Sequence, residues 1–214
     1  MEQKKYINYA IALSLITIFY NIVEGIISVY FGQTDESLAL FGFGIDSFVE
    51  VISGFGIAHL TFRMKRSEVK NWDGFERTAL KITGSAFYLL FAGLIVGALL
   101  NLINNIKPET TVAGIIISAI SILTMYFLMK AKLDVGRKLN SEAIISDANC
   151  TKTCYYLSMI LLASSLLYEI FGIGYFDILG SLGIAYFAFN EGREAFEKAK
   201  SNKLSCGCEH CNND

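Results

Sequence analysis

The stretch from Ser37 to Gly54 reads SLALFGFGIDSFVEVISG and carries two acids, Asp46 and Glu50, within an otherwise apolar run. The two acids are four positions apart, so in a helix their carboxylates lie on one face, one turn apart. A charged side chain inside a membrane costs roughly 2.5–3.5 kcal/mol on insertion scales and is a functional candidate. Two such carboxylates repel each other unless a proton or a cation joins them. The stretch therefore predicts a membrane helix with a cation-binding face.

The composition of the whole chain also favours a membrane protein. Of its 214 residues, 53% are hydrophobic and 18% are charged, and the mean hydropathy is +0.46. An average soluble domain has about a quarter charged residues. The net charge of −2 and the lack of a basic face argue against nucleic-acid binding. The apolar content excludes a disordered chain, and the length fits one domain.

Six segments are long and apolar enough for the roughly 20 residues that a membrane-spanning helix needs. They run over about 7–31, 37–62, 79–103, 111–129, 141–171 and 176–191. The single proline, Pro108, falls between the third and fourth segments, where it breaks no helix. The first segment is too long for a cleaved signal peptide and contains Glu24. We therefore predict an all-α bundle of six transmembrane helices and no cleaved leader.

The basic residues give the orientation of these spans. All but two of the 18 Lys and Arg residues lie before the first span, between spans two and three, between spans four and five, or after span six. The exceptions are Lys107 and Lys152, and Lys152 is expected to point away from the cysteines of its span. Because cytosolic loops are rich in Lys and Arg, both termini are predicted to be cytosolic in a multi-pass protein of the cell membrane.

Cys150 and Cys154 repeat the four-residue spacing in the fifth span. Asp46 and Cys150 each lie about nine residues from opposite ends of their spans, which places both roughly 14 Å into a core of roughly 30 Å. Two such pairs on facing helices would present four ligands, a number that suits tetrahedral zinc. The alternative is that the cysteines serve only as small apolar residues.

Four other polar residues have competing interpretations. Glu24 either forms a hydrogen bond between helices or lines the ion path. Asp147 lies one turn before Cys150 and is a possible fifth ligand, a proton relay or an interfacial cap. His59 is expected to be an interfacial histidine rather than a ligand. Asp177 is expected to cap the N-terminus of the sixth span.

Several stretches together resemble the cation diffusion facilitator family. They are NIVEG at 21–25, SLALFGFGIDSFVEVISG at 37–54, SEAIISDANCTKTC at 141–154 and DILGSLGIAYFAFNEG at 177–192. The resemblance covers about residues 7–192, nearly the whole membrane part. It implies export of a divalent metal from the cytosol in exchange for protons, by a homodimer. The implied site consists of Asp46, Glu50, Cys150 and Cys154.

The fifth span departs from the usual pattern of that family, in which His or Asp is followed four residues later by Asp. Here both positions are cysteine, and thiolates favour Zn²⁺, Cd²⁺, Hg²⁺ or Cu⁺ over Mn²⁺ and Mg²⁺. We expect the metal to enter between spans two and five, the ligands to lose protons on binding, and protons from outside to release it. The metal is cargo, and no cofactor is expected.

Two other functional classes compete with transport. A membrane-embedded metal-binding or regulatory protein without transport is the alternative to a transporter. An enzyme is not expected, because no span or loop combines a nucleophile, a base and an orienting group.

The C-terminal part departs from the family as well. The family usually has a cytosolic ferredoxin-like domain of some 80 residues, and only about 20 residues follow the sixth span here. We therefore expect a transmembrane domain at 1–192 and a short cytosolic tail at 193–214, without the ferredoxin-like domain. The tail contains Cys206, Cys208, His210 and Cys211. In a reducing cytosol such a cluster favours metal capture over disulfide bonding, with an unspecific reactive tail as the alternative.

Overall fold

The computed structural model describes residues 2–66 and 74–201, and all regular structure in these residues is helical. The six helices are α1 (Glu2–Thr34), α2 (Leu38–Arg66), α3 (Gly74–Asn104), α4 (Val112–Leu139), α5 (Glu142–Phe171) and α6 (Tyr175–Lys200). The prediction of an all-α bundle of six helices is confirmed. Helices α1 to α5 are long and apolar enough to cross a membrane.

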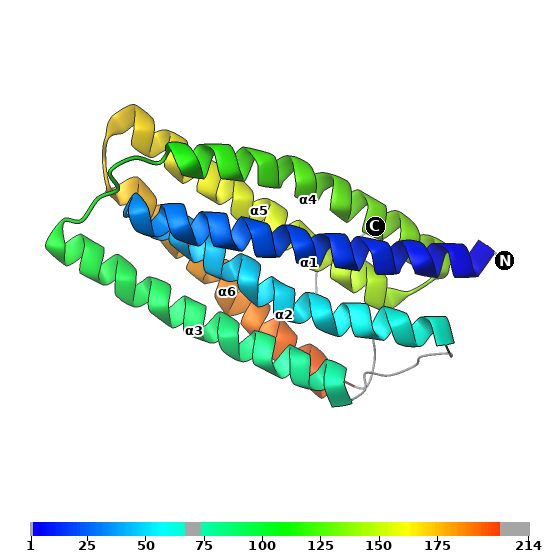
Figure 1. The fold of residues 1–214 in the computed structure, drawn as a ribbon. Coiled ribbons are helices and arrows are strands. Elements are labelled where there is room, and N and C mark those ends of the chain that lie inside the picture. Colours follow the sequence, from blue (N-terminus) through cyan, green and yellow to red (C-terminus); the bar gives the residue numbers. More distant parts are fainter. Residues whose placement is uncertain (1, 67–73, 202–214) are drawn as a thin grey trace, which may run out of the picture.

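Helix α6 differs from the other five in its composition. Asp177 lies near its start, and Glu191, Arg193 and Glu194 interrupt its second half, so its uncharged stretch is shorter. It is not among the five helices that meet the criteria for a membrane span. It nevertheless packs inside the bundle against α2, α3 and α5 (Figure 1). The sixth crossing therefore stays a prediction.

The bundle is built from helices that are neighbours in the chain and one pair that is not. Helices α1 and α2 form one antiparallel hairpin and α4 and α5 form another, whereas α3 packs along α6. Helix α2 is central and contacts α1, α3, α5 and α6. The start of α1 and the end of α6 lie at the same end of the bundle (Figure 1). The assignment of that end to the cytosol stays a prediction.

Helix α4 is longer than the sequence indicated. It was expected to end near Met129, but it continues to Leu139, so Lys132 lies in a helix and not in a loop. Hydropathy marks where a helix leaves the membrane, while the helix itself continues until the backbone must turn. The turn comes at Asn140, whose φ of 48° is left-handed, and Ser141 precedes α5 as predicted.

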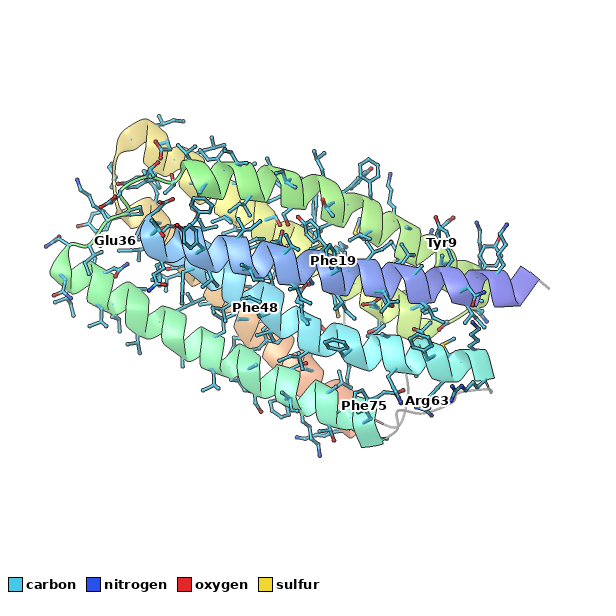
Figure 2. All side chains as sticks on the ribbon, viewed as in Figure 1. Tyr9, Phe19, Glu36, Phe48, Arg63 and Phe75 are labelled. Carbon is cyan, nitrogen blue, oxygen red and sulfur yellow. The ribbon has the colours of Figure 1, made fainter. Side chains whose placement is uncertain are left out.

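The apolar core lies where α2, α3, α5 and α6 meet. It includes the fully buried side chains of Leu40, Phe43, Leu161 and Ile184. Large apolar side chains also cover the outside of the bundle (Figure 2), and Phe19 is 70% exposed. A soluble protein rarely exposes a continuous apolar surface, so these outer faces are suited to lipid.

Asp177 caps a different helix from the one expected. Helix α6 begins at Tyr175, and its N-cap, Gly174, forms no side-chain cap. The Asp177 carboxylate instead accepts hydrogen bonds from Ser37 Oγ at 2.6 Å and from the Leu38 N–H at 2.9 Å. It therefore caps the N-terminus of α2 and ties α6 to it. The cap prediction was wrong about the helix because α6 starts two residues before Asp177.

Candidate metal-transport site

The proposed ligand pairs meet at one contact between α2 and α5. Cys154 Sγ of α5 donates a hydrogen bond to Glu50 Oε1 of α2. The second carboxylate oxygen, Glu50 Oε2, accepts a hydrogen bond from Asn21 Nδ2 of α1 at 2.9 Å. The Glu50 carboxylate is therefore held by side chains from two other helices, inside the bundle.

The other two predicted ligands lie on either side of this contact. Because α2 and α5 run in opposite directions, Cys150 is one turn nearer the end with the termini, and Asp46 is one turn nearer the opposite end. Cys150 Sγ accepts a hydrogen bond from Lys198 Nζ of α6 at 3.7 Å. Asp46 is 3% exposed and has no hydrogen bond or ion pair with the described residues.

The four side chains are consequently not gathered into a ready metal site. Within 2–66 and 74–201, no group of three or more His, Cys, Asp or Glu side chains is arranged to hold a metal ion. The structure brings Glu50 and Cys154 together and separates Asp46 from Cys150 along the bundle axis.

A cavity of about 40 Å³ lies beside this contact, on the side of Glu50 that is nearer the termini. A volume of this size holds one ion or a few water molecules. Its polar lining comes from all six helices and consists of Thr17, Asn21, Glu50, Ser53, Thr83, Lys132, Asp147, Cys150, Thr151, Glu191 and Lys198. Glu50 and Cys150 thus share a polar cavity, and Asp46 and Cys154 do not line it.

Two oxygen atoms of this lining are unpaired. Asn21 Oδ1 and Thr83 Oγ1 are buried and have no hydrogen-bond partner among the described residues. An unpaired buried acceptor costs about 1–3 kcal/mol. The cavity wall therefore offers neutral oxygen atoms in addition to its carboxylates.

Two lysines enter the cavity, and sequence reasoning did not place them there. Lys132 is 2% exposed, and its Nζ lies 3.0 Å from Asp147 Oδ2 and 2.9 Å from Thr151 Oγ1. Lys198 is 7% exposed, and its Nζ lies 2.8 Å from Glu194 Oε1. Both were counted with the basic residues outside the spans. The spacing of Glu194 and Lys198, four residues apart, is the one sequence signal that could have predicted their ion pair.

Glu191 of α6 is another cavity residue that the sequence did not single out, because it stands at the expected end of the sixth span. Asp147 also lines the cavity and is paired with Lys132 across the α4–α5 hairpin. Its three interpretations as ligand, relay or cap did not include this ion pair.

Glu24 lies away from the cavity lining. Its two carboxylate oxygens accept hydrogen bonds from Tyr20 OH at 2.9 Å and from Ser47 Oγ at 3.0 Å. Ser47 belongs to α2, so Glu24 links α1 to α2. The hydrogen bond to Ser47 joins two helices, and a role of Glu24 in the ion path stays a prediction.

His59 belongs to an ion-pair cluster between α2 and α3. The buried Glu76 carboxylate lies 3.2 Å from His59 Nδ1 and 2.7 Å from Arg63 Nη1. Arg63 and Phe75 mark this end of the two helices in Figure 2. The cluster fixes α2 against α3 outside the cavity lining. The predicted tail ligands lie outside the described residues and are Cys206, Cys208, His210 and Cys211.

Comparison with known proteins identifies the class. Residues 10–202 match the cation efflux transmembrane domain, so the chain belongs to this family of transporters and is an integral multi-pass membrane protein rather than an enzyme. It is similar to an uncharacterized transporter of Methanocaldococcus jannaschii, with 26% identity over 181 residues. The alignment covers 80% of this chain and 62% of that transporter, so the chain spans about three fifths of its relative.

Proposed function

We propose that this protein exports thiophilic divalent cations, Zn²⁺ and Cd²⁺ in particular, in exchange for protons. The ligands are Asp46, Glu50, Cys150 and Cys154. The observation that carries the proposal is the contact of Cys154 Sγ with Glu50 Oε1 inside the bundle, because it joins a thiol and a carboxylate from two helices. Membership of the cation efflux family supports the transport of a cation.

The ligand chemistry supports the choice of ion. Thiolates and carboxylates bind Zn²⁺ in tetrahedral sites, and thiolates disfavour Mn²⁺ and Mg²⁺. Because Asp46 and Cys150 are one turn to either side of the Glu50–Cys154 contact, loading requires α2 and α5 to shift along each other. The transported ion would supply the attraction for this shift.

The cavity supports an entry route. It extends from Glu50 and Cys150 toward the end that holds the termini, which we assign to the cytosol from the distribution of Lys and Arg. Asp46 lies on the other side of the contact, nearer the opposite end. We propose that metal enters through the cavity, that the bundle rocks, and that the ion leaves past Asp46.

Proton coupling follows from the ligands. Four anionic ligands around a divalent ion leave a net charge of −2, which a low-dielectric interior tolerates poorly. Metal binding requires the deprotonated ligands, so protons compete with it. Apparent affinity is expected to fall as the pH is lowered. Calorimetry in buffers of different ionisation enthalpy would detect the released protons.

The test is metal flux into vesicles with an imposed pH gradient. The wild-type protein is expected to move Cd²⁺ and Zn²⁺ at a rate that rises with the gradient, and Cys150→Ser/Cys154→Ser is expected to be inactive. Cys206→Ser/Cys208→Ser removes the same number of thiols from the tail and shows whether the loss of flux is specific to the fifth span. Equal flux in wild type and the span-five variant would rule out the thiols as ligands. Metal binding without flux would support the non-transporting alternative.

Two further parts of the proposal have separate tests. The homodimer is checked by the mass of the purified protein in detergent. Metal capture by the tail is checked by comparing the metal content of the full chain with that of a chain ending before residue 204. Equal content would limit metal binding to the membrane domain.

A further inference from the structure

Lys198 buries its ammonium where a lysine at a helix end would normally reach water. It lies two residues before the end of α6 at Lys200, yet it is 7% exposed, while Lys200 itself is exposed. A lysine in this position usually extends its side chain to the interface. The Lys198 side chain instead turns into the cavity and contacts Cys150 Sγ.

Burial of an ammonium costs several kcal/mol of folding free energy unless the charge is well paired. The partners of Lys198 must therefore compensate for its burial. Glu194, 2.8 Å away on the same helix, supplies one partner at the edge of the cavity. The same ammonium lies 3.7 Å from Cys150 Sγ, in the turn of α5 that carries the proposed ligand. The cavity wall also holds carboxylates from three helices, namely Glu50, Asp147 and Glu191. The ammonium thus lies among the anions that an incoming cation would meet.

Lys132, the second cavity lysine, is held differently. Its partners Asp147 and Thr151 both belong to α5, so it bridges α4 to α5. Lys198 Nζ lies 2.8 Å from Glu194 Oε1 of its own helix and 3.7 Å from Cys150 Sγ, so one ammonium contacts both side chains. Loss of the contact with Cys150 would leave the ion pair with Glu194 in place.

We infer that Lys198 is a tethered cation, which Glu194 holds beside Cys150 until the transported ion displaces it from the sulfur. The inference rests on the proposed function and adds a determinant of ion specificity. A cation that replaces the ammonium gains little binding free energy from its charge alone. Its binding free energy must therefore come from the bond to the Cys150 sulfur. Zn²⁺ and Cd²⁺ form that bond, whereas Mg²⁺ and Mn²⁺ depend on charge and oxygen ligands. Lys198 thereby excludes hard divalent ions from the cavity.

The test is a Cd²⁺ titration of the purified full chain, followed by the ultraviolet thiolate-to-cadmium absorption, with and without excess Mn²⁺. Lys198→Met keeps the apolar stem and removes the charge. It is expected to tighten Cd²⁺ binding about tenfold or more and to let Mn²⁺ compete. Lys198→Arg is expected to keep the wild-type exclusion of Mn²⁺. Lys200→Met removes an exposed charge two residues away and is expected to change neither value.

Wild-type Cd²⁺ affinity and wild-type exclusion of Mn²⁺ in a folded Lys198→Met protein would overturn the inference and leave Lys198 a packing residue. If that variant does not fold, Glu194→Gln tests the inference instead. It removes the carboxylate that keeps the displaced ammonium paired, so Cd²⁺ binding is expected to weaken several-fold, and unchanged affinity would overturn the inference. Cys150→Ser separates the two proposals: if the Cd²⁺ absorption is unaffected by it, the proposed transport site itself fails, whatever Lys198 does.

Discussion

Lys132 and Asp147 form an ion pair in the bundle interior, with 3.0 Å between Lys132 Nζ and Asp147 Oδ2. The two residues are on opposite sides of the α4–α5 turn and both line the cavity. A buried ion pair need not stabilise the fold, because both charges lose their hydration. Loss of one partner alone is nevertheless destabilising, since it leaves the other charge buried and unpaired.

Lys132→Met is therefore expected to lower the free energy of unfolding by about 3–5 kcal/mol. Lys132→Met/Asp147→Leu, which removes both charges, is expected to cost clearly less than either single change. Thermal unfolding in detergent measures the three variants. The matched control is Lys138→Met, because Lys138 forms a pair of similar length with Asp134, at 3.1 Å, on the exposed surface. That change should cost at most about 1 kcal/mol, and an equal cost for both lysines would contradict the prediction.

Asn21 orients the Glu50 carboxylate through its 2.9 Å hydrogen bond. Asn21→Ala is expected to weaken metal binding roughly 10–100-fold, the usual range for a group that positions a ligand. Cd²⁺ affinity of the purified protein measures the effect. Ser28→Ala is the control, since Ser28 is also a buried α1 residue, has no hydrogen-bond partner among the described residues, and does not line the cavity. A full loss of affinity in the control variant would point to a general defect of α1.

Asp177 caps α2 from α6, so Asp177→Ala should destabilise the bundle without touching the cavity. The free energy of unfolding is expected to fall by about 1–2 kcal/mol. Hydrogen exchange at the Leu38 amide, which donates to Asp177 Oδ2, is expected to speed up. Glu36→Gln changes an exposed acid beside the same helix end and should have little effect. Unchanged exchange at Leu38 in the alanine variant would show that the cap is not formed.

Gly44 allows α1 and α2 to pack closely. A Cβ atom at this position would lie 2.7 Å from Val29 N and 2.8 Å from Val29 Cγ2. Gly44→Ala is therefore expected to cost about 1–3 kcal/mol or more, the range for overpacking. Gly93→Ala is the control, because a Cβ there meets nothing within 4 Å. It should leave stability unchanged or raise it by up to about 1 kcal/mol, the gain in helix propensity. Thermal unfolding of the two variants decides the comparison.

The sequence was informative wherever the pattern is imposed by lipid. The apolar runs form the helices, Pro108 and Ser141 lie between helices, and the number of helices is confirmed. The end of α4 was misplaced because hydropathy reports the membrane boundary and not the helix boundary. The span status of α6 stays a prediction, since its second half is charged although it packs within the bundle.

The site could be predicted only in its parts. Spacing of four residues placed Asp46 with Glu50, and Cys150 with Cys154, on common helix faces. The register between antiparallel α2 and α5 is set by packing, and it decides that Glu50 contacts Cys154. The cavity lysines could not be predicted in this way. In a sequence, a lysine near the end of a span indicates only which side of the membrane that end faces, and its burial depends on packing with other helices.

The contact between α2 and α5 is among the sparsest of the packed helix pairs, whereas α1–α2 and α4–α5 are among the most extensive. The proposed ligands thus lie at the contact between two extensively packed hairpins. An ion bound to both Glu50 and Cys154 would act as a crosslink across that contact, so the loaded protein should be mechanically stiffer than the empty one. Release of the cargo would then also be the step that restores freedom of movement to the two halves.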